Sequence, residues 1–423
     1  MGKIAITSGL LLSLAALAQA EDWPAWRGPT GEGISKETNL PSRWSRDENI
    51  RFRTAIPGRG HSSPIIHGDR ILLTTCSEGK NERRLLCLDR VSGKILWDKL
   101  VLSSPLEKKH SENSFSSATP ATDGKSIWLT FMDFPEVRLY SFDMEGKKQW
   151  EKNPGKLLSR HGFCSSPVLH KNLVILNCDQ DADGFLVAVD KATGKEIWRV
   201  DRPNKTRSYC TPVLIRDPKD PSITQLVLSG SKCVTGYDAS NGKLLWIIDG
   251  PTEQYVASLV FEKNLLFLTT GFPEYHLMGI DPRGRGNVTK THVAWHIPHK
   301  ENGPKGASYV PSPLAHDGHF FVVSDVGYLG CVESLTGKRL WLEKLGRKHH
   351  ASPVYGDGKF YIPDDEGVTW VIRAGNKFEV LAKNPLGEMC YASPAISQGE
   401  IFMRTWDALY CISEKGKSAK TGK

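Results

Sequence analysis

A Ser/Thr-Pro dipeptide recurs along this chain, and no other feature constrains the fold as strongly. Neighbouring copies are 40 to 56 residues apart. One member lacks its proline and reads Ser258-Leu259, within a segment of the same shape, YVASLVFEKNLLFLTTG. Periods of this size are typical of repeat architectures, in which each unit is one small piece of supersecondary structure. Eight units result, marked by Ser63, Thr119, Ser166, Thr211, Ser258, Ser312, Ser352 and Ser393.

A second marker follows the first: a short apolar run, an Asp or its substitute, a turn with Gly-Lys, then an apolar residue before Trp. The third unit shows it as AVDKATGKEIW. In that unit, four runs rich in Val, Ile and Leu are separated by the turn-forming segments HKN, DQDADG and KATGK. Four short strands in about 45 residues are the signature of a propeller blade.

The sequence therefore predicts an all-β fold, an eight-bladed β-propeller of four-stranded antiparallel blades. A single twisted sheet cannot bury both of its faces, whereas blades packed face to face bury them mutually. A large apolar ring with one hydrogen-bond donor suits the seam between blades. We therefore assign a structural docking role to the repeated tryptophans, Trp97, Trp150, Trp198, Trp246, Trp295 and Trp341.

The two ends of the chain indicate how the ring closes. The last unit, YASPAISQGEIFMRTWDALYCISEKGK, supplies only three strands, and the segment NIRFRTAI before the first unit has Phe52 where other units have Trp. We expect residues 50–56 to complete the eighth blade, because an open sheet edge is a liability. The expected organisation is a signal peptide (1–20), an N-terminal extension (21–49), the propeller (50–414) and a basic C-terminal tail (415–423).

The first twenty residues have the pattern of a cleaved signal peptide. Lys3 precedes an apolar stretch over residues 4–18, and Ala18-Gln19-Ala20 is a small-x-small cleavage site. No cysteine follows that site, so a lipid anchor is not indicated, and no later segment is apolar enough to cross a membrane. The expected location is periplasmic or secreted.

The formal net charge of +8 is modest for 423 residues. It favours anionic partners mildly and does not indicate nucleic acid. We expect a monomer without a transmembrane segment, whose partner is a protein or an anionic or carbohydrate ligand bound at one face of the propeller.

The AVDKATGKEIW type of motif resembles the tryptophan-docking repeat of the pyrroloquinoline-quinone (PQQ) propellers. That superfamily contains the quinoprotein alcohol dehydrogenases and cofactor-free relatives, including the BamB scaffold of the outer-membrane assembly machine. The segment DWPAWRGPTGEGIS resembles the start of secreted PQQ-like propeller proteins. The resemblance covers nearly all of the expected mature chain and implies the fold, but it says little about activity.

In the dehydrogenases of this superfamily, PQQ lies over the channel with a calcium ion held by Glu, Asn and Asp, an Asp base and an adjacent cysteine pair. This chain has no adjacent cysteines, and the carboxylates near the starts of its inner strands are scattered among lysines and histidines. We interpret those carboxylates as solvated loop charges, so PQQ with calcium is disfavoured and no cofactor or catalytic residue is assigned. They are Glu112, Glu253, Glu301 and Glu388.

Nine cysteines lie at varied spacings, which argues against a zinc module. We interpret Cys164, Cys210 and Cys390 as small buried residues rather than metal ligands, so no metal site is predicted. Two pairs flank tight turns and are candidates for disulfides across hairpins, namely Cys164 with Cys178 and Cys76 with Cys87.

The connections into the inner strands of a propeller share one face, and here they are rich in basic, aromatic and imidazole side chains. One interpretation is structural, with aromatic rings that plug the channel and charges that solvate loops. The other is a basic, aromatic-lined funnel for an anionic or sugar-like ligand or an acidic peptide. Its candidate residues are Arg59, His61, Arg160, His161, Arg207, Tyr209, Tyr255, Tyr309, Arg347, His349, His350 and Tyr391.

The hypothesis that follows is an exported, non-catalytic binding or scaffold propeller that uses this face. Two alternatives remain open: a PQQ-dependent oxidoreductase of the quinoprotein alcohol or sugar dehydrogenase type, and a carbohydrate-binding propeller.

Overall fold

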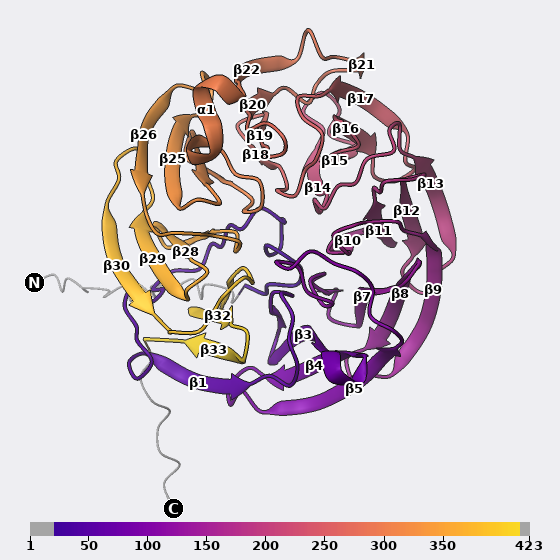
Figure 1. Cartoon of the computed structure of the whole chain (residues 1–423), viewed down its shortest axis with the longest axis vertical. Helices are drawn as coiled ribbons and strands as arrows, with labels where there is room; N and C mark the ends of the chain where they lie inside the picture. The colour runs from indigo at the N-terminus through magenta and orange to yellow at the C-terminus, as the bar shows by residue number, and fades with distance from the viewer. Residues whose placement is uncertain (1–20, 415–423) are drawn as a thin grey trace, which may run out of the picture.

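The computed structural model describes residues 21–414 and forms a ring of eight β-sheets around a central channel (Figure 1). The predicted eight-bladed propeller is thereby confirmed. Among residues 21–414 the one α-helix is α1 (His299–Gly306), and a short 3-10 helix, η1 (Glu78–Lys80), lies in the first blade. The predicted signal peptide and basic tail, residues 1–20 and 415–423, lie outside the described residues.

The first four blades follow the chain order, each from an inner to an outer strand. Blade one comprises β2 (Ile65–His67), β3 (Arg70–Ser77), β4 (Glu82–Asp89) and β5 (Ile95–Ser103). Blade two comprises β6 (Ala121–Thr122), β7 (Ser126–Asp133), β8 (Glu136–Asp143) and β9 (Lys148–Lys156). Blade three comprises β10 (Val168–His170), β11 (Leu173–Cys178), β12 (Phe185–Asp190) and β13 (Glu196–Asp201). Blade four comprises β14 (Val213–Arg216), β15 (Thr224–Gly230), β16 (Cys233–Asp238) and β17 (Leu244–Asp249), with β21 (Gly286–Asn287) added in parallel.

The other blades use the same arrangement. Blade five comprises β18 (Val260–Glu262), β19 (Leu265–Thr269), β20 (Leu277–Ile280) and β22 (Val293–Ile297). Blade six comprises β23 (Leu314–His316), β24 (His319–Val323), β25 (Tyr328–Glu333) and β26 (Arg339–Lys344). Blade seven comprises β27 (Val354–Gly356), β28 (Lys359–Pro363), β29 (Val368–Arg373) and β30 (Val380–Pro385). Blade eight comprises β31 (Ala395–Ser397), β32 (Glu400–Arg404), β33 (Ala408–Ile412) and β1 (Ile50–Ala55).

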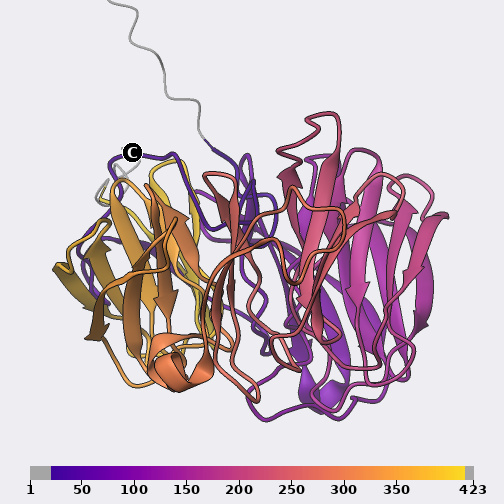
Figure 2. The ribbon, with the colours of Figure 1, turned by 90° about the horizontal axis from the view of Figure 1, so that it is seen from above.

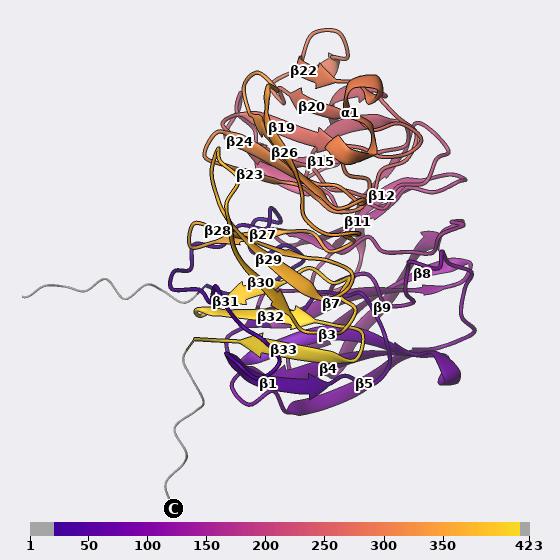
Figure 3. The same cartoon turned by 60° about the vertical axis from the view of Figure 1, so that its left-hand side comes forward.

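The expected closure of the ring is confirmed, because β1 pairs antiparallel with β33 (Figure 3). Phe52 on β1 takes the place that tryptophans hold in other blades: a Cβ added to Gly93 in the turn of blade one would clash with the Phe52 ring. Gly93 has a φ of 71°, so the turn favours glycine for its conformation as well as for this close contact.

The tryptophans lie at the seams between blades. The Trp97 indole donates to the backbone carbonyl of Met144 in the next blade at 3.2 Å, and the Trp150 indole donates to that of Lys191 at 3.0 Å. Each bond ties the outer strand of one blade to the outer turn of the next. Trp246 differs, since the turn of blade five is lengthened, and its indole donates to the Gln225 side chain at 2.8 Å within its own blade.

The Ser/Thr-Pro marker forms a closed ring of hydrogen bonds around the channel. In each blade the backbone N–H of the marker Ser or Thr donates to the marker hydroxyl of the following blade, at 2.9 to 3.2 Å. The last bond runs from Ser393 to Ser63 and completes the circle. In blade five, which lacks the proline, the Ser258 hydroxyl still accepts the Thr211 N–H at 3.0 Å. We call this set of eight bonds the hydroxyl ring.

Residues 21–49, which we call the strap, cross the face opposite α1. Figure 2 shows the orange helix on one side of the disc and the indigo strap on the other. We call these sides the mouth face and the far face. Arg27 of the strap is fully buried and donates to the backbone carbonyl of Pro313 at 2.6 Å, within blade six. Trp23, also fully buried, exchanges backbone hydrogen bonds with Ile66 of blade one. The strap thus covers the far end of the channel.

None of the helices among residues 21–414 has the length and apolar character needed to cross a membrane.

Candidate functional site

A cavity of about 360 Å³ opens at the mouth face, on the axis of the ring. Every blade contributes to its wall. The residue two positions before each marker Ser or Thr faces it in all eight blades, which follows from the shared start of the inner strands. These eight residues are His61, Ser117, Cys164, Tyr209, Val256, Val310, His350 and Tyr391. Connections and hairpin tips add His110, Glu112, Asn113, His161, Tyr275, Tyr309, Asp325 and Lys348.

Half of the predicted site residues line this cavity. They are His61, His161, Tyr209, Tyr309, His350 and Tyr391. Residues at neighbouring positions before each marker were predicted to share the funnel, although successive residues of an extended chain point to opposite sides. Tyr309, three residues before its marker, lines the cavity all the same. Tyr255 and His349, also three residues before their markers, are buried away from the cavity: the Tyr255 hydroxyl donates to a backbone carbonyl at 2.7 Å, and His349 Nδ1 lies 2.8 Å from another.

The predicted arginines do not line the cavity. Arg207 donates to the Asp181 carboxylate at 2.6 Å. Arg347 has an 87% exposed side chain and lies 3.5 Å from the Glu366 carboxylate. Both cations are therefore paired at the rim, and neither side chain lines the cavity.

Two further arginines complete the predicted set. The Arg59 guanidinium lies 4.9 Å from the centre of the Trp406 ring, and Arg160 is exposed to solvent. The basic funnel predicted from the sequence is thus a loose rim of cations around a cavity whose own wall has a different composition.

Rings form two stacked walls of the cavity. On one side the His350 and Tyr391 rings lie 4.4 Å apart and His61 lies 4.9 Å from Tyr391. On the other side the His161 and Tyr209 rings are stacked with 5.9 Å between their centres. Such walls offer flat apolar faces together with hydroxyl and imidazole groups at their edges.

His350 lies between two carboxylates on this wall. Its Nδ1 lies 2.8 Å from the Asp365 carboxylate and its Nε2 lies 3.3 Å from that of Glu112. Burial disfavours the imidazolium, but these two carboxylates outweigh burial and raise the pKa of His350. Lys348 also pairs with Glu112 at 2.9 Å. Glu112, interpreted from the sequence as a solvated loop charge, is instead part of the cavity wall.

Asp325 is a cavity residue that sequence reasoning missed. The backbone N–H groups of Tyr309 and Val310 donate to its carboxylate at 2.7 and 2.9 Å, yet burial raises the pKa of Asp325 above its ordinary value. A signal for it was present. Asp325 in SDVG and Asp365 in DDEG both stand two residues before the glycine of a hairpin turn, in consecutive blades.

His61 is neutral. Burial, reinforced by the nearby Arg404, lowers the pKa of His61 to about 3. Arg404 is itself buried behind this wall and donates to the backbone carbonyls of Ser62 and Thr74 at 3.0 and 2.6 Å. It stiffens the seam between blades eight and one, and it is not among the residues that line the cavity.

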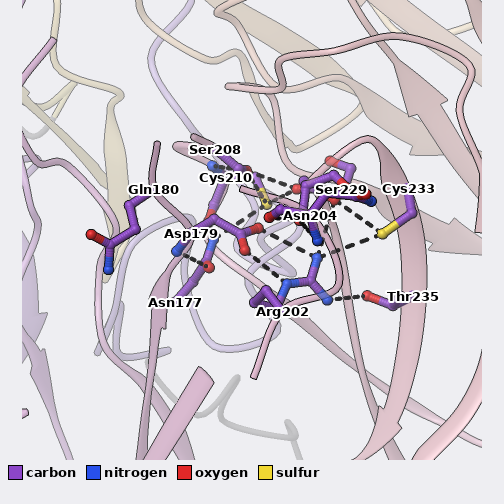
Figure 4. Close-up of polar contacts among 12 residues, drawn as sticks. Asn177, Asp179, Gln180, Arg202, Asn204, Ser208, Cys210, Ser229, Cys233 and Thr235 are labelled. Carbon is purple, nitrogen blue, oxygen red and sulfur yellow. Dashed lines mark hydrogen bonds and ion pairs between the residues drawn. The ribbon is translucent and has the colours of Figure 1, made fainter. Parts of the chain in front are cut away.

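A buried polar cluster supports the wall that carries Tyr209 (Figure 4). The Arg202 and Asp179 side chains are fully buried and paired at 2.8 Å, and Arg202 also donates to Thr235 at 2.9 Å. Ser208, which precedes Tyr209, donates to a backbone carbonyl of blade four at 2.8 Å. The cluster joins blade three to blade four, which fixes the start of the fourth inner strand.

The suggested disulfides are absent: all nine cysteines lie within residues 21–414 and carry free thiols. Cys76 lies opposite Arg83 in its hairpin, and Cys87 lies opposite Leu72, so the strand register separates that pair. Among the described residues, no group of three or more His, Cys, Asp or Glu side chains has the arrangement of a metal site.

The residues at the mouth do not fit PQQ with calcium. A calcium ion takes six to eight oxygen ligands. The Glu112 oxygens face Lys348 and His350, and those of Asp325 accept backbone N–H groups. The Asn113 oxygen accepts hydrogen bonds from its own connection. Glu112, Asp325 and Asn113 together therefore do not offer the six to eight oxygens that a calcium ion requires.

Comparison with known proteins agrees with this fold. The model of the family described as outer membrane protein assembly factor BamB matches residues 115–264. No curated protein matches the chain at a significant level. Similar solved structures include BamB from Moraxella catarrhalis, with a TM-score of 0.55 and 11% identity, over 87% of this chain and 100% of that one.

Two dehydrogenases are also similar in structure. A europium-containing methanol dehydrogenase has a TM-score of 0.69 and 11% identity, over 93% of this chain and 98% of that one. A quinohemoprotein alcohol dehydrogenase from Comamonas testosteroni has a TM-score of 0.67 and 12% identity, over 97% and 83%. The predicted resemblance to PQQ-like β-propellers is confirmed, and at these identities the structures show the fold alone.

Proposed function

We propose that this PQQ-like propeller is an exported, periplasmic or secreted, non-catalytic binding protein that holds its ligand or partner at the mouth face. The observation that carries the proposal is the cavity of about 360 Å³ to which all eight blades contribute. A concave site with aromatic walls and a few polar groups is the usual form of a ligand site.

The groups on the cavity wall support binding rather than oxidation. The carboxylates are held by protein donors, and His61 is buried and neutral. The stacked rings supply contact area at little conformational cost. The similarity to BamB supports a role as a binding propeller, since the protein with that name is described as an assembly factor.

Three probes of contrasting chemistry test the site: methyl α-glucoside, citrate and choline. We expect at least one of them to bind in calorimetry and to raise the melting temperature. The Tyr391→Ala/His161→Ala double variant removes a ring from each wall and should weaken that binding at least about tenfold, a loss of about 1.4 kcal/mol. Lys36→Ala, on the exposed part of the strap, is the matched control and should bind as the parent protein does.

Two results would contradict the proposal. If none of the probes binds, or if the double variant binds as the parent protein does, the mouth is not the site. Dye-linked oxidation of alcohols or sugars that requires both added PQQ and added calcium would replace it with the oxidoreductase alternative.

A further inference from the structure

Blades six and seven place an aspartate at the same position, but only one of the two carboxylates has a cationic partner. Asp325 and Asp365 each accept a backbone N–H from the residue two positions before the marker serine, both at 2.9 Å. That residue is Val310 in blade six and His350 in blade seven. The two blades therefore present the same carboxylate in the same hydrogen-bonded frame.

The side chain two positions before the marker serine decides whether the aspartate of that blade has a basic partner. In blade seven the imidazole Nδ1 of His350 lies 2.8 Å from the second oxygen of Asp365, which favours the protonated ring. In blade six the equivalent Val310 has no charge to offer, and the second oxygen of Asp325 accepts only the Tyr309 N–H. No Lys, Arg or His nitrogen among residues 21–414 forms an ion pair with Asp325. When it is ionised, the Asp325 carboxylate therefore has no ion-pair partner of its own, although the charge of a protonated His350 acts on it.

Two carboxylates, Glu112 and Asp325, line the cavity together with Lys348 and His350, and Asp365 pairs with His350 from outside the lining. Glu112 is paired with both basic groups. The unmatched carboxylate is Asp325. A cavity that presents an uncompensated carboxylate attracts a positive charge and repels an anion.

Aromatic rings adjoin this carboxylate. Tyr275 and Tyr309 both line the cavity, and burial together with the Asp325 charge raises the pKa of each hydroxyl, so both remain neutral phenols. Tyrosine faces attract organic cations through their π electrons, and such rings beside a carboxylate are suited to an ammonium group.

We propose that the mouth cavity selects an organic ammonium, and that Asp325 with the flanking tyrosines is its recognition site. The inference rests on the proposed function, because it names the chemistry of the ligand for the same cavity. It replaces the anionic ligand expected from the basic rim with a cationic one. The ammonium belongs either to a small amine or to a lysine side chain of a partner protein.

A cation with a fixed charge and its uncharged isostere provide the direct test. Choline and 3,3-dimethylbutan-1-ol have the same shape, and only choline carries a charge. We expect choline to bind the full protein at least about tenfold more tightly in calorimetry, as one unscreened ion pair would give. Equal binding of the two probes, or no binding of choline at millimolar concentration, would overturn the ammonium proposal.

Two substitutions test the residue. Asp325→Asn should weaken choline binding at least about tenfold. Val310→His copies blade seven, supplies an internal cation to Asp325 and should weaken choline binding by a similar factor. Asp317→Asn, in the exposed turn between β23 and β24, is the matched control and should change binding less than about threefold, because Asp317 does not line the cavity. Normal choline binding by both Asp325→Asn and Val310→His would overturn the assignment, and the second variant keeps the test valid if the first does not fold.

The pH dependence has a definite sign. Choline cannot titrate, so a change comes from the protein, where Asp325 faces His350, Tyr275 and Tyr309. Only the ionised carboxylate attracts the cation, and therefore binding should weaken as the pH falls toward the raised pKa of Asp325. Binding that strengthens on acidification would contradict the proposal.

The same experiments separate the two sources and the two proposals. Nα-acetyl-lysine amide presents a lysine side chain, so tighter binding of this probe than of choline assigns the ammonium to a partner protein, and the reverse assigns it to a small amine. If methyl α-glucoside binds and is lost in Tyr391→Ala/His161→Ala while choline does not bind, the mouth is the site and the ammonium proposal alone fails.

Discussion

The two ends of the central channel are built on the same eight inner strands and finished in opposite ways. At the far end the strap inserts Trp23 and Arg27, both fully buried, and satisfies backbone groups of several blades. At the mouth the equivalent space is an open cavity with charged and aromatic groups that are only partly covered. The repeat fixes the ring, and residues outside the repeat decide which end is sealed and which end is left to bind.

We expect the free energy of unfolding to depend more on the far end of the channel than on the mouth. Trp23→Ala removes a fully buried indole and should lower the free energy of unfolding by about 3–5 kcal/mol. Urea denaturation monitored by circular dichroism measures the change. Tyr391→Ala at the mouth is the counterpart and should cost much less. Equal losses at the two ends would erase the distinction.

The hydroxyl ring lies between the two ends and should show an intermediate effect. Ser258→Ala leaves the buried Thr211 N–H without an acceptor and should cost about 1–3 kcal/mol. The exposed Thr38→Ala serves as the control in the same denaturation experiment. If both variants unfold at the same urea concentration as the parent, the ring contributes nothing to stability.

Acid should reveal the cost of keeping His61 neutral at the mouth. Its folded pKa of about 3 lies below the ordinary value of 6.5, so the unfolded chain binds the extra proton between these values. The free energy of unfolding therefore has its full value, as far as His61 is concerned, above about pH 6.5. It falls by about 1.4 kcal/mol for each pH unit between 6.5 and 3. His61→Gln should reduce the slope of stability against pH by that amount, and an unchanged slope would mean that His61 is protonated in the fold.

The smallest effect is expected at the rim. Arg347→Ala should change the free energy of unfolding by less than about 0.5 kcal/mol, because a mostly exposed ion pair contributes little. A loss above about 1 kcal/mol in the same urea series would show that the rim helps to hold the blades together.

The sequence was sufficient for the ring and insufficient for the cavity, for identifiable reasons. The marker serines, the tryptophans and Phe52 recur at fixed positions, so periodicity predicted eight blades and their closure. Position before the marker does not by itself decide which side chain enters the cavity. Tyr255 and Tyr309 both stand three residues before their markers, and only Tyr309 lines the cavity.

Ion pairs between distant residues were harder to predict from the sequence than the residues that line the cavity. Arg207 and Asp181 lie 26 positions apart in the chain, and only the folded ring shows that they neutralise each other. Asp325 stands in a hairpin turn, far from the segments that precede the markers, so a search limited to those segments passed over it. Repeats therefore predict architecture, and pairing between repeats decides electrostatics.

The strap has a consequence for how anything can occupy this molecule. Because the strap covers the far end, the channel is a cup rather than a tunnel. A bound molecule therefore enters and leaves by one opening, and the water that it displaces leaves through the same opening. A long polymer cannot be threaded through the ring as through a sliding clamp. Only a small molecule, a chain end or a single protruding side chain can reach the base of the cup, and a partner protein would have to dock as a lid upon the mouth face.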